Sequence, residues 1–454
     1  MADVIPFRGW RYNPDKGCEA SSVLAPPYDV ISECERRAFV DKHPYNIVRL
    51  TLGLDPLGTA PTRSRYELAA ADLREWRREG ILVQDPAPAF YLYEQRYIAP
   101  APVPRAEPNP VTRRGVVGLV KLAEYDERIV LPHEGTLATP KVDRRRLLDA
   151  MQCSESQVFG MYSDPDMVLE SVAEEACAHP PLWEMTDRDG VQHRLWLIDD
   201  EARCGRLTSM FASRPVVIAD GHHRYETALA YRQAQREKHG TDGDAPWDYV
   251  SMFLCNADAG QLTILPSHRL VKELPLEAEA QLWRSVMDVF ETERVTIDSS
   301  SDQARADGIH ALLDRMSQAG PDEHRFALYA GGNYALLLHL NDLQRAMAHG
   351  VADLPPATRE LDVALLHKLL IEGIMGLSGD MAATGVNVLF SRDGHDAANR
   401  VARGEAAMVL YVNTTRVEQV MAIATAGQKM PQKGTYFYPK ALAGIVLHDL
   451  RPEG

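Results

Sequence analysis

Residues 215–271 alternate between strand-like runs and a helix, and this alternation restricts the fold more than any other feature of the chain. The run PVVIA (215–219) is short and apolar, YETALAYRQAQREK (225–238) is typical of a helix that ends at Gly240, and DYVSMFLCNA (248–257) is again strand-like. Strand, turn, helix and strand in this order are typical of helices packed on a β-sheet. We therefore predict a mixed α/β (α+β) fold.

The chain has 454 residues, which is too many for a single compact core. We expect a β-rich N-terminal segment at 1–112 that packs on the core and includes a helix opened by a Ser64–Glu67 capping box. An α/β core at 113–275 follows. A C-terminal α+β unit occupies 276–454, and its last segment, 430–446, is expected to return to the functional site.

Composition and charge narrow the class of partner. The net charge of −15 argues against an extended nucleic-acid surface and leaves room for a local basic pocket that binds a small anion. Six scattered cysteines without a CxxC pair indicate reduced thiols, and neither a signal peptide nor a membrane-spanning run is evident. We expect a cytoplasmic protein with a small-molecule substrate. The sequence leaves its oligomeric state open, a homodimer included.

The turn between strand and helix, DGHHR, holds the strongest candidate residues: Asp220, Gly221, His222, His223 and Arg224. The glycine permits a sharp turn and a close backbone approach. The N–H groups that open the following helix, together with the arginine, would bind a phosphate, and Asp220 could hold Mg²⁺ or orient a hydroxyl. The alternative is that Asp220 only caps the helix and both histidines are exposed turn residues.

Three other segments place polar residues beside apolar runs. LPHEGTL (131–137) contains His133 and Glu134, where the carboxylate could act as a general base or metal ligand, or simply be solvated. PSHRL (266–270) repeats a His-Arg pair, His268-Arg269, at the end of the apolar run LTILP, which suggests one pocket shared with the first pair. KGTYFYPK (433–440) could bring Lys433, Tyr436 and Lys440 to a phosphate or a base, and the alternative is that its aromatic residues belong to the core.

Several common site motifs are missing. The chain has no P-loop, no GxGxxG after a strand, no GxSxG and no HExxH. The histidines at 133, 222, 223 and 268 lack the local spacing of a zinc site, so we consider zinc unlikely. The tight turn APPYDVIS (25–32), which presents Tyr28 and Asp29, is compatible with a structural or a functional role.

Ten motifs in order resemble a widespread prokaryotic family known as domain of unknown function 1015: RGWRYNP, APPYDVIS, NIVRL, YEQRY, LPHEGTL, VFGMYSDP, IADGHHRYETAL, ILPSHRLV, LDVALLHKLL and MPQKGTYFYPK. The resemblance extends from Phe7 to about Ile445. The chain departs from the family pattern in a Pro-rich insertion at 99–110, which we expect to be an exposed hairpin loop. It departs again at Gly434, where a serine is expected, and this weakens any role for a hydroxyl there.

The strand–DGHHR–helix element is also similar, more distantly, to the phosphate-binding box of the ParB/sulfiredoxin-like fold, over residues 113–275. That fold includes free serine kinases, in which an acidic residue upstream of the box acts as the base. The resemblance implies a nucleotide, ATP or ADP, with Mg²⁺. It also implies Glu134 as the base, with Asp220 beside it.

We therefore expect a kinase that phosphorylates a hydroxyl of a free amino acid such as L-serine. Gly221, His222, His223 and Arg224 would bind the transferred phosphoryl group, and His268, Arg269 and Lys440 would close the pocket. Two alternatives use the same cluster. One is a phosphatase or other metal-dependent hydrolase, and the other is a regulatory protein that binds a nucleotide without turnover.

Overall fold

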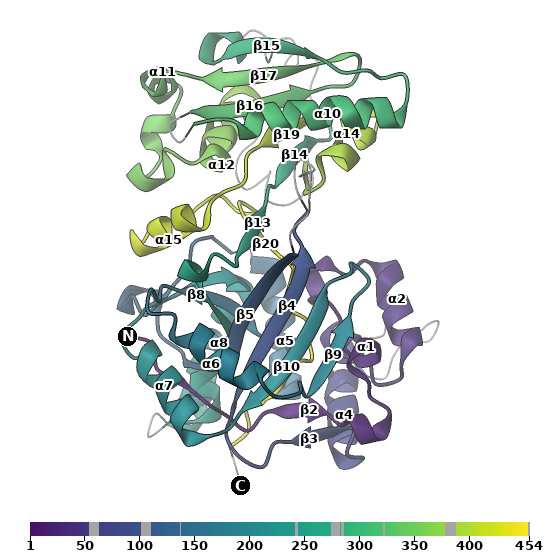
Figure 1. The fold of residues 1–454 in the computed structure, drawn as a ribbon, viewed down its shortest axis with the longest axis vertical. Coiled ribbons are helices and arrows are strands. Elements are labelled where there is room, and N and C mark those ends of the chain that lie inside the picture. The colour runs from purple at the N-terminus through teal and green to yellow at the C-terminus, as the bar shows by residue number, and fades with distance from the viewer. Residues whose placement is uncertain are drawn as a thin grey trace.

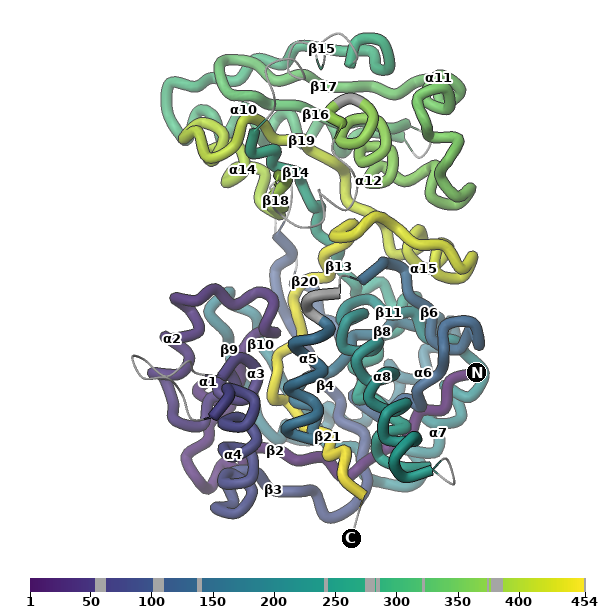
Figure 2. The backbone as a smooth tube through the Cα atoms, turned by 180° about the vertical axis from the view of Figure 1, so that it is seen from behind, coloured from purple at the N-terminus to yellow at the C-terminus, as the bar shows by residue number. Residues whose placement is uncertain are grey.

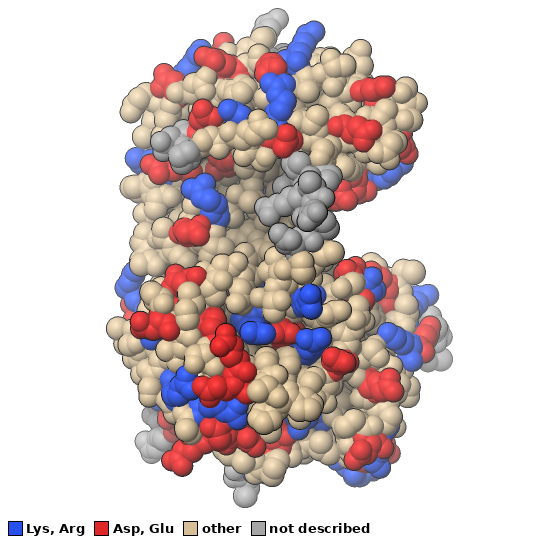
Figure 3. Space-filling view, viewed as in Figure 1, with Lys and Arg blue, Asp and Glu red and all other residues tan. Residues whose placement is uncertain are grey.

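The computed structural model has two lobes joined by a narrow waist (Figure 1). It describes residues 1–53, 63–100, 110–136, 138–240, 244–273, 282, 286–320, 323–376 and 387–452. A nine-stranded sheet forms the lower lobe and a six-stranded sheet the upper lobe. Both ends of the chain lie in the lower lobe, and the space-filling view shows the indentation at the waist with acidic and basic side chains interspersed over this face (Figure 3).

The lower sheet has the strand order β6-β11-β8-β12-β5-β4-β10-β9, with β1 paired to β5. Strands β6 and β11 are parallel, as are β8 and β12, and the other neighbours are antiparallel. The strands are β1 (Val4–Ile5), β4 (Phe90–Ile98), β5 (Pro110–Lys121), β6 (Val130–Leu131), β8 (Val158–Tyr162), β9 (Trp183–Thr186), β10 (Gln192–Ile198), β11 (Val216–Asp220) and β12 (Tyr249–Asn256).

Helices bury both faces of this sheet, which explains why its strands are almost continuously apolar. Along β4, Phe90 and Leu92 face the core that contains α6 (Val168–Cys177) and α7 (Glu201–Phe211). Tyr91 and Tyr93 point to the opposite core. That second core is covered by α1 (Ala20–Val23), α3 (Val48–Thr51), α4 (Arg65–Arg78) and α5 (Ala138–Met151). Helix α8 (His222–His239) lies beside α5 (Figure 2).

The upper sheet is antiparallel throughout, in the order β15-β17-β16-β19-β14-β18. Its strands are β14 (His268–Val271), β15 (Glu291–Thr296), β16 (His324–Tyr329), β17 (Tyr334–Leu340), β18 (Val388–Ser391) and β19 (Met408–Val412). Separate apolar clusters cover its two faces. The described helices of this lobe include α10 (Asp302–Ser317), α11 (Leu343–Ala348), α12 (Asp362–Leu365), which continues as a π-helix over Leu366–Ile374, and α14 (Gly394–Ala402).

At the waist, β13 (Thr263–Leu265) pairs with β20 (Tyr436–Tyr438). The apolar run LTILP and the His-Arg pair that follows it belong to two different sheets, because β14 begins only after Pro266 and Ser267. A proline has no N–H with which to continue a ladder. The C-terminal segment leaves the upper lobe through α15 (Val417–Thr425) and returns to the lower lobe, where β21 (His448–Asp449) pairs with β7 (Cys153–Ser154).

These observations confirm the predicted mixed α/β class and several local signals. The capping box is present, since the Glu67 carboxylate accepts from the Ser64 N–H at 2.7 Å and Ser64 Oγ accepts from the Glu67 N–H at 3.3 Å. The predicted hairpin around 99–110 is bracketed by the pair Ile98–Pro110, while residues 101–109 lie outside the described part of the chain. Two further pieces of the lower lobe are α2 (Glu33–Lys42) and the pair β2 (Trp10–Tyr12) and β3 (Leu82–Gln84).

A search of the described helices for a membrane span finds none that combines the necessary length with the necessary apolar character.

Candidate functional site

A cleft of about 320 Å³ lies at the waist and collects most of the residues predicted from the sequence. Its walls come from the start of α8, the segment after β6, the tight turn before α2, the end of β18 and the returning C-terminal segment. Eight predicted site residues line it: Glu134, Asp220, Gly221, His222, His223, Arg224, Tyr436 and Lys440. The DGHHR turn, the segment with Glu134 and the C-terminal segment with Tyr436 and Lys440 therefore line one cleft.

The backbone at the end of β11 aims the DGHHR turn into this cleft. The pairing of β11 with β8 shifts by one residue between Ile218 and Asp220, which is a β-bulge and re-aims the strand end. Gly221 follows with φ of 92°, a left-handed conformation that glycine adopts without strain. Among the described residues no side chain caps α8, so the N–H groups of its first turn and the helix dipole are available to an anion in the cleft.

Replacing Gly221 with Ala is therefore expected to damage the turn in two ways. The left-handed conformation would cost about 1–2 kcal/mol, and the new Cβ would lie 3.0 Å from Nε of Arg224. We expect weaker binding of tripolyphosphate, measured by calorimetry, together with a lower unfolding temperature. The variant Gly205→Ala is a suitable control, since nothing lies within 4 Å of its Cβ position in α7. Unchanged tripolyphosphate binding in Gly221→Ala would contradict this role for the turn.

Asp220 is paired with two cations from different parts of the chain. Its Oδ1 accepts from Nζ of Lys440 at 2.8 Å, and its Oδ2 accepts from Nη2 of Arg224 at 3.2 Å. Burial alone would raise the pKa of Asp220, but Lys440 and Arg224 outweigh it and hold that pKa well below the ordinary value. Asp220 is therefore an ionised carboxylate that keeps an ammonium and a guanidinium group in the cleft.

Glu134 has the opposite electrostatic environment in the same cleft. It follows β6 and forms a parallel bridge with Met430, and its Oε1 accepts from the backbone N–H of Lys433 at 2.8 Å. Burial raises the pKa of Glu134 to about 7, although the Lys433 N–H opposes the shift. Glu134 and Asp220 thus have pKa values far apart, which is a common property of acid–base sites.

His222, which lines the cleft, and His133, which lies behind it, form a neutral hydrogen-bond network. The Nδ1–H of His133 donates to the carbonyl of Ile218 at 2.6 Å, so its Nε2 accepts from the Thr435 hydroxyl at 2.9 Å. Nε2 of His222 accepts from the backbone N–H of His133 at 3.3 Å. Burial lowers the pKa of His133 to about 4 and holds that of His222 well below its ordinary value. His133, a candidate residue of the LPHEGTL segment, does not line the cleft but supports it through Thr435, which does.

The second predicted His-Arg pair does not enter the cleft. His268 lines a neighbouring cavity of the upper lobe with His324 and Asp362, and burial lowers the pKa of His268 to about 3. Arg269 is fully buried, stacks on Phe390 with 4.7 Å between its Cζ and the ring centroid, and donates to the carbonyl of Lys433 at 3.4 Å. The sequence predicted that this pair would close the pocket at the DGHHR turn, and this is corrected, because the chain breaks at Pro266 and places both residues in the upper sheet.

Comparison with known proteins supports the family resemblance noted in the sequence. A family model described as "Protein of unknown function (DUF1015)" matches residues 4–364. The chain belongs to the DUF1015 family. No curated protein matches this DUF1015 chain significantly.

Solved structures similar to this DUF1015 protein are distant. A free serine kinase in complex with AMP has 13% sequence identity and a TM-score of 0.34, covering 71% of this chain and 86% of that one. A conserved hypothetical protein from Pyrococcus furiosus has 13% identity and a TM-score of 0.33, with coverage of 74% and 93%. SbnI from Staphylococcus aureus has 10% identity and a TM-score of 0.33, with coverage of 73% and 86%.

Other residues of the cleft in this DUF1015 protein were not predicted from the sequence as site residues, or were predicted without a definite role. Arg392, which follows β18, stacks its Cζ 3.7 Å from the ring centroid of Tyr436, and Nζ of Lys440 lies 4.2 Å from the same centroid. No local pattern marks Arg392, because only the fold brings the upper sheet to the cleft. Tyr28 and Asp29 also line the cleft. The signal for them was the Pro-Pro turn that presents two polar residues in succession.

Proposed function

We propose that this protein is a small-molecule kinase that transfers a phosphoryl group from ATP or ADP to the hydroxyl of a free amino acid, with L-serine as the first substrate to test. The observation that carries the proposal is the opposite shift of the pKa values of Glu134 and Asp220, which line one cleft. Glu134 has a pKa of about 7, while Asp220 is held ionised between Lys440 and Arg224. A base that titrates near neutral pH beside a fixed group of cations suits proton removal coupled to phosphoryl transfer.

Glu134 is the base in this scheme. The substrate hydroxyl gives its proton to the Glu134 carboxylate as its oxygen forms a bond to the terminal phosphorus of the nucleotide. The bond between that phosphorus and the bridging oxygen breaks, and the shortened nucleotide leaves with the electron pair. The Lys433 N–H, which donates to Oε1 at 2.8 Å, fixes the orientation of the carboxylate.

The phosphates would lie at the start of α8. The first-turn N–H groups, Arg224 and Lys440 supply positive charge at fixed positions, and such preorganised groups stabilise the charge that develops in the transition state. His222 and His223 line the same wall. Burial lowers the pKa of His223 as well, so both rings are expected to act as neutral hydrogen-bond partners near neutral pH.

The predicted role of Asp220 as a Mg²⁺ ligand fits its surroundings poorly. Mg²⁺ is usually held by one or two carboxylates together with substrate phosphates and water. Both oxygens of Asp220 already pair with Lys440 and Arg224, and within the described ranges no three acidic, His or Cys side chains are arranged to hold a metal ion. We therefore derive no step through a bound metal and assign Asp220 the positioning of the two cations.

The test is a transfer assay with labelled ATP and ADP against a panel of free amino acids and sugars. We expect a phosphorylated hydroxyl product, and we expect Lys440→Ala to lower its rate by about 10²-fold, because a preorganised cation at the transferred group is lost. Lys121→Ala is the control, since this exposed lysine also pairs with a carboxylate, that of Asp244 at 2.7 Å. Equal rates in the two variants would contradict the assignment of Lys440.

The same assay separates the alternatives. Release of inorganic phosphate without a phosphorylated acceptor would replace the kinase with a phosphatase that uses the same cluster. A rise in unfolding temperature with nucleotide, but no product of either kind, would indicate a nucleotide-binding regulator.

A further inference from the structure

A second cavity, of about 370 Å³, adjoins the cleft on the side of Glu134. Gly135 and Gln432 line both spaces, so the two have one wall in common. Glu134 lines the cleft and is bridged to Met430, which lines the second cavity. The proposed base therefore lies between the two spaces, and the volume of the second one is within the range of small-ligand pockets.

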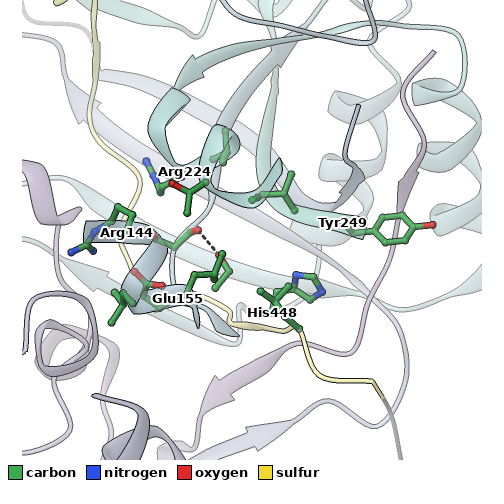
Figure 4. A pocket seen from close by; sticks show the side chains of 14 residues that line it. Arg144, Glu155, Arg224, Tyr249 and His448 are labelled. Atoms are coloured by element: carbon green, nitrogen blue, oxygen red, sulfur yellow. Dashed lines mark hydrogen bonds between the residues drawn. The ribbon is translucent and has the colours of Figure 1, made fainter. Parts of the chain in front are cut away.

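The pocket behind the DGHHR turn is too small for either substrate. Figure 4 shows it among Arg144, Glu155, Arg224 and His448, and its volume of about 50 Å³ holds a few water molecules. In phosphoryl transfer the attacking and leaving oxygens lie roughly in line, on opposite sides of the phosphorus. With the phosphates at the DGHHR turn, the acceptor is expected to approach from the side of Glu134, where the second cavity lies.

A π-helix supplies the polar wall of the second cavity. His367, Lys368 and Glu372 of the segment Leu366–Ile374 all line it. Residues five apart on an α-helix do not face each other, but here Nδ1 of His367 lies 4.0 Å from Oε1 of Glu372. Nζ of Lys368 donates to Oε2 of Glu372 at 3.2 Å. The wider turn, a rare conformation that is frequent at functional sites, thus gathers three polar side chains on one wall.

The charges in this cavity suit a zwitterion. The side chain of Glu372 is 34% exposed, and its carboxylate has acceptor positions left beside the bond from Lys368. Burial lowers the pKa of His367 to about 4, so this imidazole is neutral near pH 7 and leaves the charge of Glu372 to other groups. Lys429, from the returning C-terminal segment, adds a positive charge. Apolar side chains complete the lining: Leu354, Pro355, Ala364, Met430 and Pro431.

We propose that the second cavity binds the acceptor of the transfer, a small hydroxy amino acid such as L-serine, through both of its charged groups. The proposal rests on the proposed function, which supplies the acceptor. The ammonium group of the amino acid donates to Glu372, and its carboxylate pairs with Lys429. The hydroxyl then extends past Gly135 to the Glu134 carboxylate. A sugar or a simple alcohol has neither charge, so it gains nothing from these two side chains.

The recognition of both charges is tested by calorimetric binding of L-serine and two analogues, in the presence of saturating tripolyphosphate. L-glycerate has a hydroxyl in place of the ammonium group, and L-serinamide has an amide in place of the carboxylate. L-serine is expected to bind at least about 10-fold more tightly than either analogue, the usual effect of one hydrogen bond to a charged group.

Two substitutions should change the two preferences separately. In Glu372→Gln the ratio of the dissociation constants of L-glycerate and L-serine should fall towards one, while the preference over L-serinamide remains. Lys429→Ala should show the reverse. Glu405→Gln is the control and should keep both preferences, since this carboxylate of the same lobe also pairs with a cation, Arg403 at 2.6 Å, but lies outside both linings. Unchanged ratios in Glu372→Gln and Lys429→Ala, including equal weakening of all three compounds, would overturn the assignment.

The transfer assay separates this cavity from the proposed function. L-serine that binds with both preferences but receives no phosphoryl group would overturn the kinase and leave the amino-acid site in place. Transfer to L-serine with the same KM for L-serine in Glu372→Gln and Lys429→Ala as in the unmodified protein would overturn the site and leave the kinase. Absence of both binding and transfer would remove the two together.

Discussion

Replacing Glu134 with Gln is expected to lower the rate of phosphoryl transfer by about 10²–10⁴-fold, the usual contribution of a positioned general base. The amide keeps the size of the side chain and can still accept from the Lys433 N–H, which contacts Oε1 at 2.8 Å in the unmodified protein. It cannot take a proton from the substrate. The loss should therefore appear in kcat, with little change in the unfolding temperature.

The dependence of the transfer rate on pH tests the role of Glu134 by a second measurement. Because burial raises the pKa of Glu134 to about 7, the carboxylate is protonated below that pH and cannot act as a base. The value of kcat/KM should rise with pH up to about 7, and fall tenfold for each unit below it. The residual activity of Glu134→Gln should not show this fall of kcat/KM below pH 7.

The control for this pair of measurements is Glu237→Gln, an exposed glutamate near the end of α8. Its rate and its pH profile should match those of the unmodified protein. If Glu134→Gln keeps both the transfer rate and its fall below pH 7, the base is another residue, and the kinase mechanism derived from this cleft is wrong.

Replacing Arg113 with Met is expected to lower the free energy of unfolding by about 3–5 kcal/mol, because it leaves several buried carbonyl oxygens without a donor. Arg113 is fully buried, and its Cζ lies 4.8 Å from the ring centroid of Phe159. Its guanidinium donates to Gln95 Oε1 at 3.1 Å and to the carbonyl of Tyr438 at 3.3 Å, and also to the carbonyl of Pro439. These bonds hold the segment that carries Lys440 against β5.

Urea unfolding measures this loss, and the neighbouring residue provides a matched control. Arg114 pairs with Glu94 at 2.8 Å, but its side chain is 27% exposed, so Arg114→Met should cost clearly less. Under conditions where both variants remain folded, Arg113→Met should also lose more transfer activity than Arg114→Met, because Lys440 is displaced from Asp220. Equal stability of the two variants would show that the C-terminal segment is held by other contacts.

Local signals in the sequence were sufficient for the class of fold and for half of the site. The apolar runs and the helical periodicity of residues 215–257 predicted mixed α/β structure, and Ser64 with Glu67 predicted the start of α4. The DGHHR turn was predicted to be an anion site from neighbouring residues alone, and this stays a prediction. All these features depend on groups close together in the chain, where backbone geometry and side-chain hydrogen bonds act over a few residues.

The other half of the site depends on contacts between distant segments, which no local pattern specifies. The ion pair of Lys440 with Asp220 joins residues 220 positions apart, and it is formed only because the C-terminal segment returns to the lower lobe. The break at Pro266 sent His268 into the upper sheet, although its motif resembled the first His-Arg pair.

The protonation of the two carboxylates was likewise decided by the tertiary structure. Glu134 and Asp220 are both acidic residues placed after apolar strands in the sequence, and nothing local distinguishes their titration. Burial raises the pKa of Glu134, while Lys440 and Arg224 lower that of Asp220. Sequence thus determined which chemical groups the chain carries and where its strands turn. Packing determined the dielectric surroundings and the charged neighbours of each group, because both depend on residues remote in the chain.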